Sequence, residues 1–557
     1  MNVKTGLTGA LPAIIIVSAL LTAVVSMFLL WLYRRAVVRA MSAQAGVVVT
    51  PVASAPVSSR VVSGSLPVLT IIDSTPKLGE PPQGGTGYTQ ATQSLKQTVL
   101  VYATGGLVFA LIMALAWVIA AGCGFSVVRF LLLLSYYSWP IILVVSLLTP
   151  TGRSRIIPVY VAIVLAFIGI ALIRNPDDLT VGQLVYLWFF ANGPGTVLLL
   201  AFLNRRVRAV GPLVLAFMVV AVTGAVIIVS AVGDSQGILR GIAEIGSMLG
   251  LGAPAIFVLL FIIGFVIFGV LGWWLLRWLG RRYQKKRMSD QSISLDALWL
   301  LFGVAQSFTL VFEGWAWIFT GLVALVAYKL ALRIGFTALL REQGDSGKAK
   351  LLLLLRVFSL GQRSERLFDM ISKVWLRIGS IGLIAGPDLV TSTVEPHEFL
   401  NFLGGRLSRQ FIQGEADLEQ RVSHMDTQPD PDGRHRVNEF FCRSDTWQMT
   451  MRRLVDRSDA VLMDLRSFSK NNQGCIYELQ QLFNSIALNR VILVINDLTD
   501  RTFLEMTVGN IWQNLEPSSP NIELSRPAVR CFSVKEQSQA EMKKLLHILF
   551  STRTVIA

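Results

Sequence analysis

The chain has 557 residues, of which 53% are hydrophobic and only 15% are charged. Soluble globular proteins carry about 25% charged residues, so this composition excludes an ordinary soluble enzyme, a disordered chain and a disulfide-rich module. The net charge of +15 lies entirely in residues 1–350, because residues 351–557 hold 24 basic and 24 acidic residues. Since the basic excess accompanies long apolar runs, we interpret it as the bias that orients membrane helices, and we expect no nucleic-acid partner.

The first apolar run covers residues 11–33 and is followed directly by Arg34, Arg35 and Arg39. A cleavable signal peptide carries its positive charge before its apolar core. The reversed flanks therefore predict an uncleaved transmembrane anchor over residues 1–35, with the N-terminus outside.

Residues 36–97 are rich in Ser, Pro and Gly and show no sustained helical or strand period. This composition predicts a disordered cytoplasmic linker, because such a segment cannot bury enough apolar surface to fold. The short apolar patch at residues 68–72 leaves a docking strand open as an alternative.

Further apolar runs predict an eight-helix transmembrane region over residues 98–335, which brings the expected number of spans to nine. With the N-terminus outside, the cytoplasmic loops hold 14 basic residues beside the spans, against four in the outer segments. This bias predicts a multi-pass protein of the cell inner membrane, with the lipid bilayer as a partner and the C-terminal domain in the cytoplasm. The eight runs cover residues 99–121, 129–149, 156–173, 182–203, 212–232, 254–276, 294–312 and 314–333.

Three features of the predicted membrane region bear on function. No Asp, Glu, Lys or His lies near the middle of a predicted span, which argues against a proton-coupled transporter. The sequence FFANGPGT at residues 189–196 is expected to kink or interrupt a helix. Residues 235–252 resemble an amphipathic helix at the outer surface. The basic run at residues 277–287 serves topology in our preferred interpretation, and binding of anionic lipid headgroups is the alternative.

After a linker over residues 336–350, short apolar runs alternate with amphipathic helical patterns. This alternation predicts an α/β domain over residues 351–557, with a mainly parallel sheet flanked by helices. The strands are expected at 351–358, 380–387, 437–442, 459–465, 489–497 and 528–534, and the helices at 364–379, 395–412, 444–458, 474–487 and 538–551.

Ligands of parallel α/β sheets bind at the carboxyl ends of the strands. Asp464 and Arg466 lie at such an end, as cofactor-binding candidates or as a structural ion pair. Ser359, Gln362 and Arg363 follow the first strand of the domain and are placed to meet phosphates, or to form a solvated turn.

The cysteines and histidines predict no metal site. The chain has four of each, without a CxxC pair or an HExxH motif. Residues 430–434 open like a calcium loop, but no Glu completes a 12-residue frame, so we expect a plain turn.

The segment SDAVLMDLRSFSKNNQGCIYELQQL, residues 458–482, resembles the centre of TIR domains. In that family a Trp-bearing helix precedes an acidic-flanked strand, as Trp447 does here, and the next helix opens with a Trp-Cys-x-x-Glu-like motif. This chain has Cys475 and Glu478 at the corresponding positions, whereas Gly474 stands where the family often has Trp. The resemblance implies a bacterial polytopic membrane protein whose C-terminal domain is TIR-like, or is a relative in the same flavodoxin-like group.

The resemblance also implies a role for Glu478 as the acidic residue of TIR enzymes that cleave NAD. NAD is then the substrate, and the chemistry requires no cofactor or metal. One carboxylate can stabilise the oxocarbenium-like transition state of N-glycosidic cleavage. The 3.6-residue period places Glu478 at the margin of the apolar stripe of its helix, neither buried nor fully solvated. The alternative role is that of a surface Glu.

Three functions therefore stay open at the sequence level. The first is a membrane-anchored signalling or effector protein with a NAD glycohydrolase domain. The second is a non-enzymatic interaction module that forms homo-oligomers through the TIR-like domain, with Tyr477 on the outward face of its helix. The third is a transporter or channel with a regulatory domain.

Overall fold

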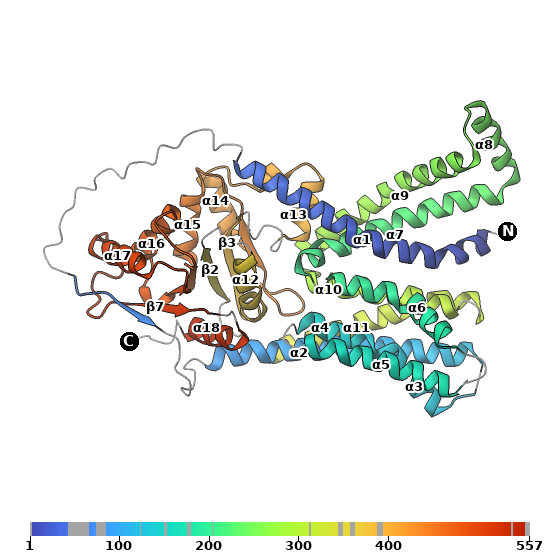
Figure 1. Ribbon diagram of the computed structural model, residues 1–557, viewed down its shortest axis with the longest axis horizontal. Coiled ribbons are helices and arrows are strands. Elements are labelled where there is room, and N and C mark those ends of the chain that lie inside the picture. Colours follow the sequence, from blue (N-terminus) through green and yellow to red (C-terminus); the bar gives the residue numbers. More distant parts are fainter. Residues whose placement is uncertain are drawn as a thin grey trace. The chain divides into compact units, whose positions relative to one another are not determined.

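The computed structural model describes residues 3–42, 66–73, 85–122, 124–149, 153–174, 180–202, 204–310, 313–343, 349–356, 362–386, 394–535 and 538–551. The chain forms two compact units, one made of apolar helices and one with a central sheet (Figure 1). The helical unit comprises residues 1–31, 98–342 and 394–400, and the α/β unit comprises residues 32–97, 343–393 and 401–557.

The helical unit confirms a multi-pass membrane protein. By length and composition, six helices among the described residues can cross a membrane: Leu20–Met41, Gly87–Ala120, Val127–Leu148, Val210–Gly233, Ala253–Gln284 and Thr320–Leu339. The helices of this part of the chain are α1 (Val3–Ser42), α2 (Gly85–Ala120), α3 (Val127–Ser138), α4 (Pro140–Leu148), α5 (Arg153–Arg174), α6 (Val181–Phe202), α7 (Arg205–Asp234), α8 (Gln236–Met248), α9 (Ala253–Gln284), α10 (Asp290–Leu310) and α11 (Thr320–Gln343).

Close backbone contacts hold several of these helices together. A side chain at Gly321 of α11 would collide with the backbone of Gly303 in α10, and a side chain at Gly264 of α9 would collide with Ala225 of α7. Small residues at such crossings let helices pack closely where the hydrophobic effect does not drive their association. These glycines therefore set two of the helix pairings.

The structure differs from the sequence prediction in two places within the helical unit. Helix α6 is continuous through residues 189–196, which contradicts an interruption there, whereas a kink is compatible with a continuous helix. Neighbouring helices can satisfy backbone groups near a proline, so membrane helices tolerate it. The second difference is Lys329, which lies within the candidate span Thr320–Leu339 and pairs with Asp296 at 2.6 Å. Pairing neutralises both charges, which lowers the cost of placing them beside apolar helices.

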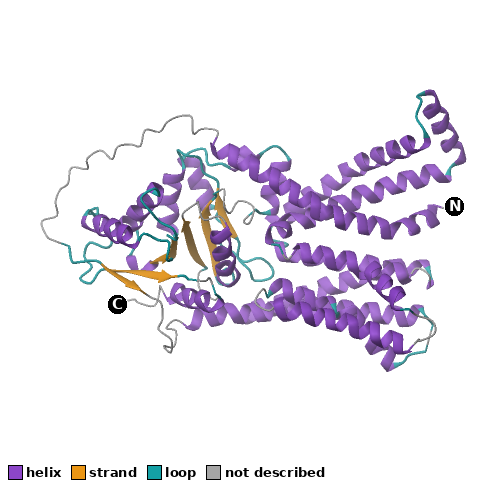
Figure 2. Cartoon of the chain, in the orientation of Figure 1, coloured by secondary structure: helices purple, strands orange, loops and turns teal. Residues whose placement is uncertain are grey.

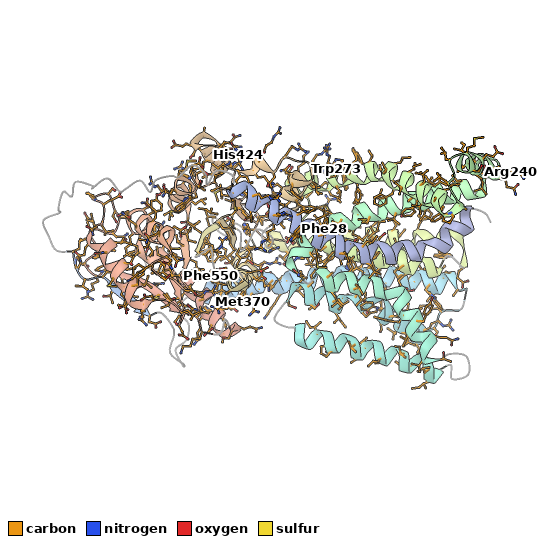
Figure 3. The ribbon with its side chains drawn as sticks, turned by 45° about the horizontal axis from the view of Figure 1, so that its top comes forward. Phe28, Arg240, Trp273, Met370, His424 and Phe550 are labelled. Carbon is orange, nitrogen blue, oxygen red and sulfur yellow. The ribbon has the colours of Figure 1, made fainter. Side chains whose placement is uncertain are left out.

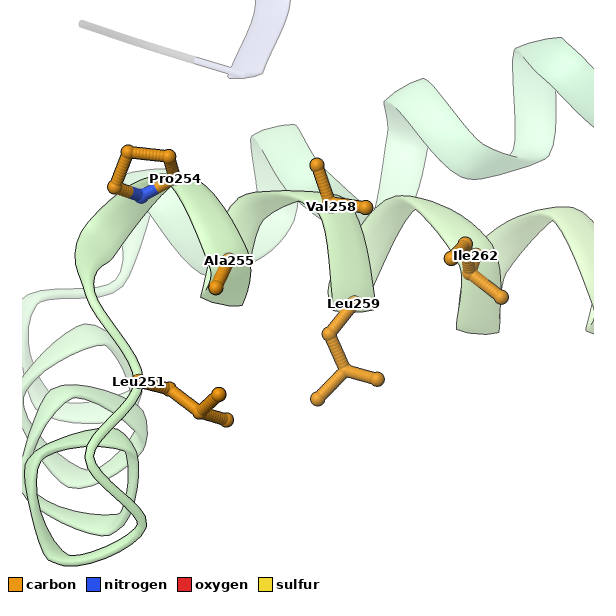
Figure 4. Close-up of a pocket in the computed structure, with 6 residues that line it drawn as sticks. All are labelled: Leu251, Pro254, Ala255, Val258, Leu259 and Ile262. Atoms are coloured by element: carbon orange, nitrogen blue, oxygen red, sulfur yellow. The ribbon is translucent and has the colours of Figure 1, made fainter.

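Near the α8–α9 elbow, an apolar pocket of about 430 Å³ is lined by Leu251, Pro254, Ala255, Val258, Leu259 and Ile262 (Figure 4). The helix predicted within residues 235–252 is confirmed as α8. The lining side chains are all apolar, as expected for a surface that faces lipid tails.

The α/β unit contains a seven-stranded parallel sheet in the order β1-β7-β6-β5-β2-β3-β4 (Figure 2). The expected fold class is therefore confirmed. The strands are β1 (Thr70–Asp73), β2 (Lys350–Arg356), β3 (Gly379–Ile384), β4 (Val437–Phe440), β5 (Ala460–Asp464), β6 (Val491–Ile495) and β7 (Ala528–Ser533). The five strands β3-β2-β5-β6-β7 follow the flavodoxin-like order, and β4 and β1 extend the sheet at its two edges.

Helices cover both faces of the sheet. Successive residues of a strand point to opposite faces, so each inner strand contributes side chains to two cores. Leu353 and Leu355 of β2 belong to one core, with α14 (Glu415–Ser423), α15 (Trp447–Arg457), α16 (Gln473–Ser485) and α17 (Arg501–Gln513). Leu352 and Leu354 belong to the other, with α12 (Gln362–Trp375) and α18 (Gln539–Ser551). In this second core Trp375 stacks on Phe550, which Figure 3 labels, with ring centres 5.2 Å apart. The short helix α13 (Pro396–Leu403) covers only part of the predicted helix 395–412.

Part of the predicted linker is ordered. The strand β1 pairs with β7 from Thr70↔Ala528 to Asp73↔Cys531, and the indole of Trp512 donates a hydrogen bond to the carbonyl of Pro67 at 2.8 Å. Residues 85–97 form the start of α2, where Ala91 joins the second core. Disorder is therefore the wrong description for residues 66–73 and 85–97, and the docking-strand alternative is correct. Leu66, Leu69 and Ile71 are partly buried against the first core and Ala91 is fully buried in the second, contacts that an average over the Pro- and Gly-rich composition does not reveal.

Two helices of the membrane region extend beyond the segments predicted for them. Helix α1 continues past residue 35 to Ser42, and α11 continues to Gln343 within the expected linker 336–350. A helix continues beyond its apolar segment when nothing breaks it, and neither extension contains a proline.

Candidate functional site

The candidate site lies where the strand order reverses, between β2 and β5. Successive strands are added outward from β2 through β3 to β4, and the chain then returns to place β5 beside β2. At the carboxyl ends of this pair, Arg356 and Asp464 lie opposite each other in register. Such a reversal is where doubly wound sheets bind ligands.

Glu478 lies in the second turn of α16, the helix that follows β5, and it is only 3% exposed. The prediction that it lies at a half-solvated margin is therefore wrong. Burial raises the pKa of Glu478 to about 8, and the positive charge of Arg356 lowers it in part. Its Oε2 atom is buried and has no hydrogen-bond partner among the described residues. A buried carboxyl without a partner is costly and marks a candidate functional group.

Arg356 is the site residue that the sequence analysis missed. It ends β2, is 3% exposed, and donates a hydrogen bond from Nη1 to the carbonyl of Ile384 at 3.3 Å. Its side chain is the charged partner that reaches Glu478 electrostatically. The signal was available, because a single arginine follows five consecutive leucines in this strand, and a buried charge needs a partner.

Asp464 and Arg466 form a buried two-pronged ion pair. The Arg466 Nε atom donates to Asp464 Oδ1 at 2.7 Å and Nη2 donates to Oδ2 at 2.6 Å, and the two side chains are 1% and 2% exposed. This geometry corresponds to the structural alternative raised from the sequence. The pair shapes the loop after β5, and its charged atoms are already occupied by each other.

The residues predicted to follow the first strand divide into three cases. Ser359 lies outside the described residues. Gln362 is the first residue of α12. Arg363 has an exposed side chain, while its backbone carbonyl accepts a hydrogen bond from Arg466 Nη2 at 3.1 Å. The structure thus brings Arg363, Asp464 and Arg466 together through backbone and ion-pair contacts.

The loop after β5 is fixed to the loop after β6. Ser467 adopts a left-handed backbone conformation with φ of 64°, and its N–H donates to Asn496 Oδ1 at 3.1 Å. The hydroxyl of Thr499 donates to the carbonyl of Leu465 at 3.0 Å. These bonds fix the loop that leads from β5 into α16. They therefore help to hold the start of α16, and with it Glu478, at the carboxyl ends of the strands.

Cys475 lies one helical turn before Glu478 on the same face of α16. Burial, followed by the negative charges of Glu478 and Asp464, raises the pKa of the Cys475 thiol well above its usual range. A thiol that stays protonated is a poor nucleophile. Cys475 therefore contributes to the site as a buried, protonated thiol that packs beside Glu478.

The outer side of α16 differs in part from expectation. Tyr477 is half-buried, its ring lies 5.4 Å from that of Trp447, and its hydroxyl accepts a hydrogen bond from Arg452 Nε at 2.8 Å. It therefore bridges α15 and α16 and does not point freely outward. Gly474 is exposed and has open space where a side chain would project, so packing does not forbid the Trp found there in TIR domains.

No protein-family model matches the chain, and no curated protein is similar to it in sequence.

Proposed function

We propose that the protein is a membrane-anchored signalling or effector protein. Its TIR-like domain binds NAD at the carboxyl ends of β2 and β5 and hydrolyses it. One observation carries the proposal: Glu478 is buried near Arg356 at the strand-order reversal, and its Oε2 atom has no hydrogen-bond partner among the described residues. The flavodoxin-like order of five strands and the TIR-like motif around Cys475 and Glu478 support the same assignment.

The proposed reaction breaks the bond between nicotinamide and the ribose C1′. Nicotinamide leaves with the electron pair of that bond, water adds to C1′, and the products are nicotinamide, ADP-ribose and one proton. The positive charge that develops on the ribose favours an ionised Glu478. Because burial raises the pKa of Glu478 to about 8, the reactive carboxylate forms only as pH rises toward that value.

A second candidate function keeps the fold without the reaction. Glu478 is 3% exposed, so a ligand reaches it only if the surrounding side chains move apart. This burial favours an interaction module that self-associates, with the exposed start of α16 around Gly474 as a contact surface. Under this alternative the buried carboxyl has no catalytic role.

The test is nicotinamide release by the full-length protein in membrane vesicles, with and without crosslinking that clusters it. Glu478→Gln keeps the shape of the side chain and removes its charge, and the expected loss in rate is on the order of 10²–10³. Glu505→Gln, on the exposed side of α17, is the matched control and should retain full activity. Equal activity of Glu478→Gln and wild type refutes the catalytic assignment. Absence of turnover by the clustered wild type favours the interaction module.

A further inference from the structure

The last turns of α9 and the residues that follow carry a dense set of basic and aromatic side chains, which we name the α9 basic end. The C-terminal turn of α9 contains Arg281 and Arg282, and the helix ends at Gln284. Lys285 and Arg287 follow directly, while Arg277 precedes them by one turn. The tryptophans are Trp273, Trp274 and Trp278, and Figure 3 labels Trp273 on this helix.

These side chains share one face of the helix. At about 100° per residue, the arc that begins at Trp273 and ends at Arg282 spans about 180° and includes Arg277, Trp274 and Arg281. The opposite side is the packed one, where the buried residues Gly272, Leu276, Gly280 and Tyr283 lie. The exposed face of this apolar helix is therefore aromatic and strongly basic where the helix ends.

Two arginines are stacked on tryptophans one turn earlier. The Arg277 guanidinium carbon lies 5.2 Å from the centre of the Trp273 ring, and that of Arg282 lies 4.5 Å from the Trp278 ring. Stacking leaves the N–H donors at the guanidinium edge available for oxygen acceptors. Tryptophans gather at the level of lipid headgroups, so the stacked arginines lie where lipid phosphates would be.

Five basic side chains of this face have no acidic partner in the part of the chain that the structure describes. Among the described residues, no acidic group pairs with Arg277, Arg281, Arg282, Lys285 or Arg287. By contrast, Lys329 of α11 has Asp296 as its partner. A concentrated charge that the protein leaves unpaired beside an apolar span needs counter-charge from its surroundings.

We propose that the α9 basic end is a binding surface for the headgroups of anionic phospholipids. The charges attract the lipid, the stacked guanidinium groups donate hydrogen bonds to the phosphate, and the exposed Trp274 and Trp278 contact the upper acyl chain. The role goes beyond orientation of the helix, because topology requires only that positive charge follows the span. The inference is independent of the proposed NAD chemistry.

The experiment uses the full-length protein in phosphatidylcholine vesicles that contain trace spin-labelled phosphatidylglycerol or spin-labelled phosphatidylcholine. The measured quantity is the fraction of each label that is motionally restricted by the protein. At low salt, wild type should restrict phosphatidylglycerol several-fold more than phosphatidylcholine. In the double variant Arg281→Gln/Lys285→Gln the two lipids should be restricted nearly equally, because each charge removed contributes up to about fivefold to the preference. High salt should weaken it as well.

The matched control removes two exposed basic charges elsewhere, in the variant Arg129→Gln/Arg333→Gln. Both variants change the net charge equally, so only a local site distinguishes them. A preference retained by the control and lost in the α9 variant, with unchanged melting temperatures, supports the surface. Equal restriction of both lipids by wild type, or equal losses in the two variants, overturns it.

Discussion

Replacement of Glu478 by Gln should stabilise the α/β unit at alkaline pH. In the unfolded chain a Glu carboxyl loses its proton above its ordinary pKa of 4.5, whereas in the folded unit burial raises the pKa to about 8. Between these values the folded state holds one more proton than the unfolded state, so stability falls as pH rises. At about 1.4 kcal/mol per pH unit, the stability lost between pH 4.5 and pH 8 is about 5 kcal/mol.

Gln has the shape of the protonated acid and does not ionise, so the variant should escape this loss. At pH 5 the two proteins should melt at similar temperatures. At pH 8.5 the variant should melt higher by on the order of 10 °C, since each kcal/mol shifts a domain of this size by about 2–4 °C. Tryptophan fluorescence of the full-length protein in detergent, recorded during heating from pH 5 to pH 9, measures the difference.

The control for this prediction is Glu505→Gln, because Glu505 is 52% exposed and pairs with Arg501 on the same helix. It should follow the pH dependence of wild type. Parallel melting curves for wild type and Glu478→Gln at every pH would show that the buried carboxyl does not titrate as described.

Three further predictions follow from the packing and the topology. Asp464→Asn leaves Arg466 charged and buried without its partner, so it should destabilise the α/β unit by about 3–5 kcal/mol in chemical denaturation, and a change below 1 kcal/mol would contradict the buried pair. Residues 345–557 expressed alone should melt below the same segment fused to residues 66–97, because β1 and the start of α2 complete its sheet edge and second core; equal melting temperatures would show that these contacts contribute nothing. Reporter fusions active only in the cytoplasm should be active after residues 290 and 557 and silent after residue 240, and the reverse pattern would invert the proposed orientation.

The sequence predicted the sheet well because parallel strands buried on both faces are continuous apolar runs. Leu351–Leu355 and Val491–Ile495 are such runs, and both are strands within one or two residues of expectation. For β1 it favoured disorder and left a docking strand only as the alternative, because Thr70 to Asp73 is a strand by virtue of the edge of β7 that is available as its partner. It also missed α17, whose N-cap Asp500 accepts a hydrogen bond from the backbone of Phe503 and offered a local signal.

For the candidate site, the sequence identified Glu478 and the strand end that carries Asp464, but it misjudged their surroundings. Helical periodicity gives the direction of a side chain on its own helix and not what other elements place over it. The burial of Glu478 depends on the carboxyl ends of the strands that lie beside it. Arg356 can be assigned to the site only once β2 is known to neighbour β5. The Asp464–Arg466 pair was foreseeable because both residues lie on one short turn.

The most direct test of the central claim is the pH dependence of kcat/KM for nicotinamide release from NAD by the clustered full-length protein. This ratio reports the ionisation of groups in the free enzyme. If ionised Glu478 performs the reaction, kcat/KM should rise about tenfold per pH unit below pH 8 and level off above it, in line with the raised pKa of the buried carboxyl. A kcat/KM that is constant between pH 6 and pH 9, or that falls over this range, would contradict the assignment of Glu478.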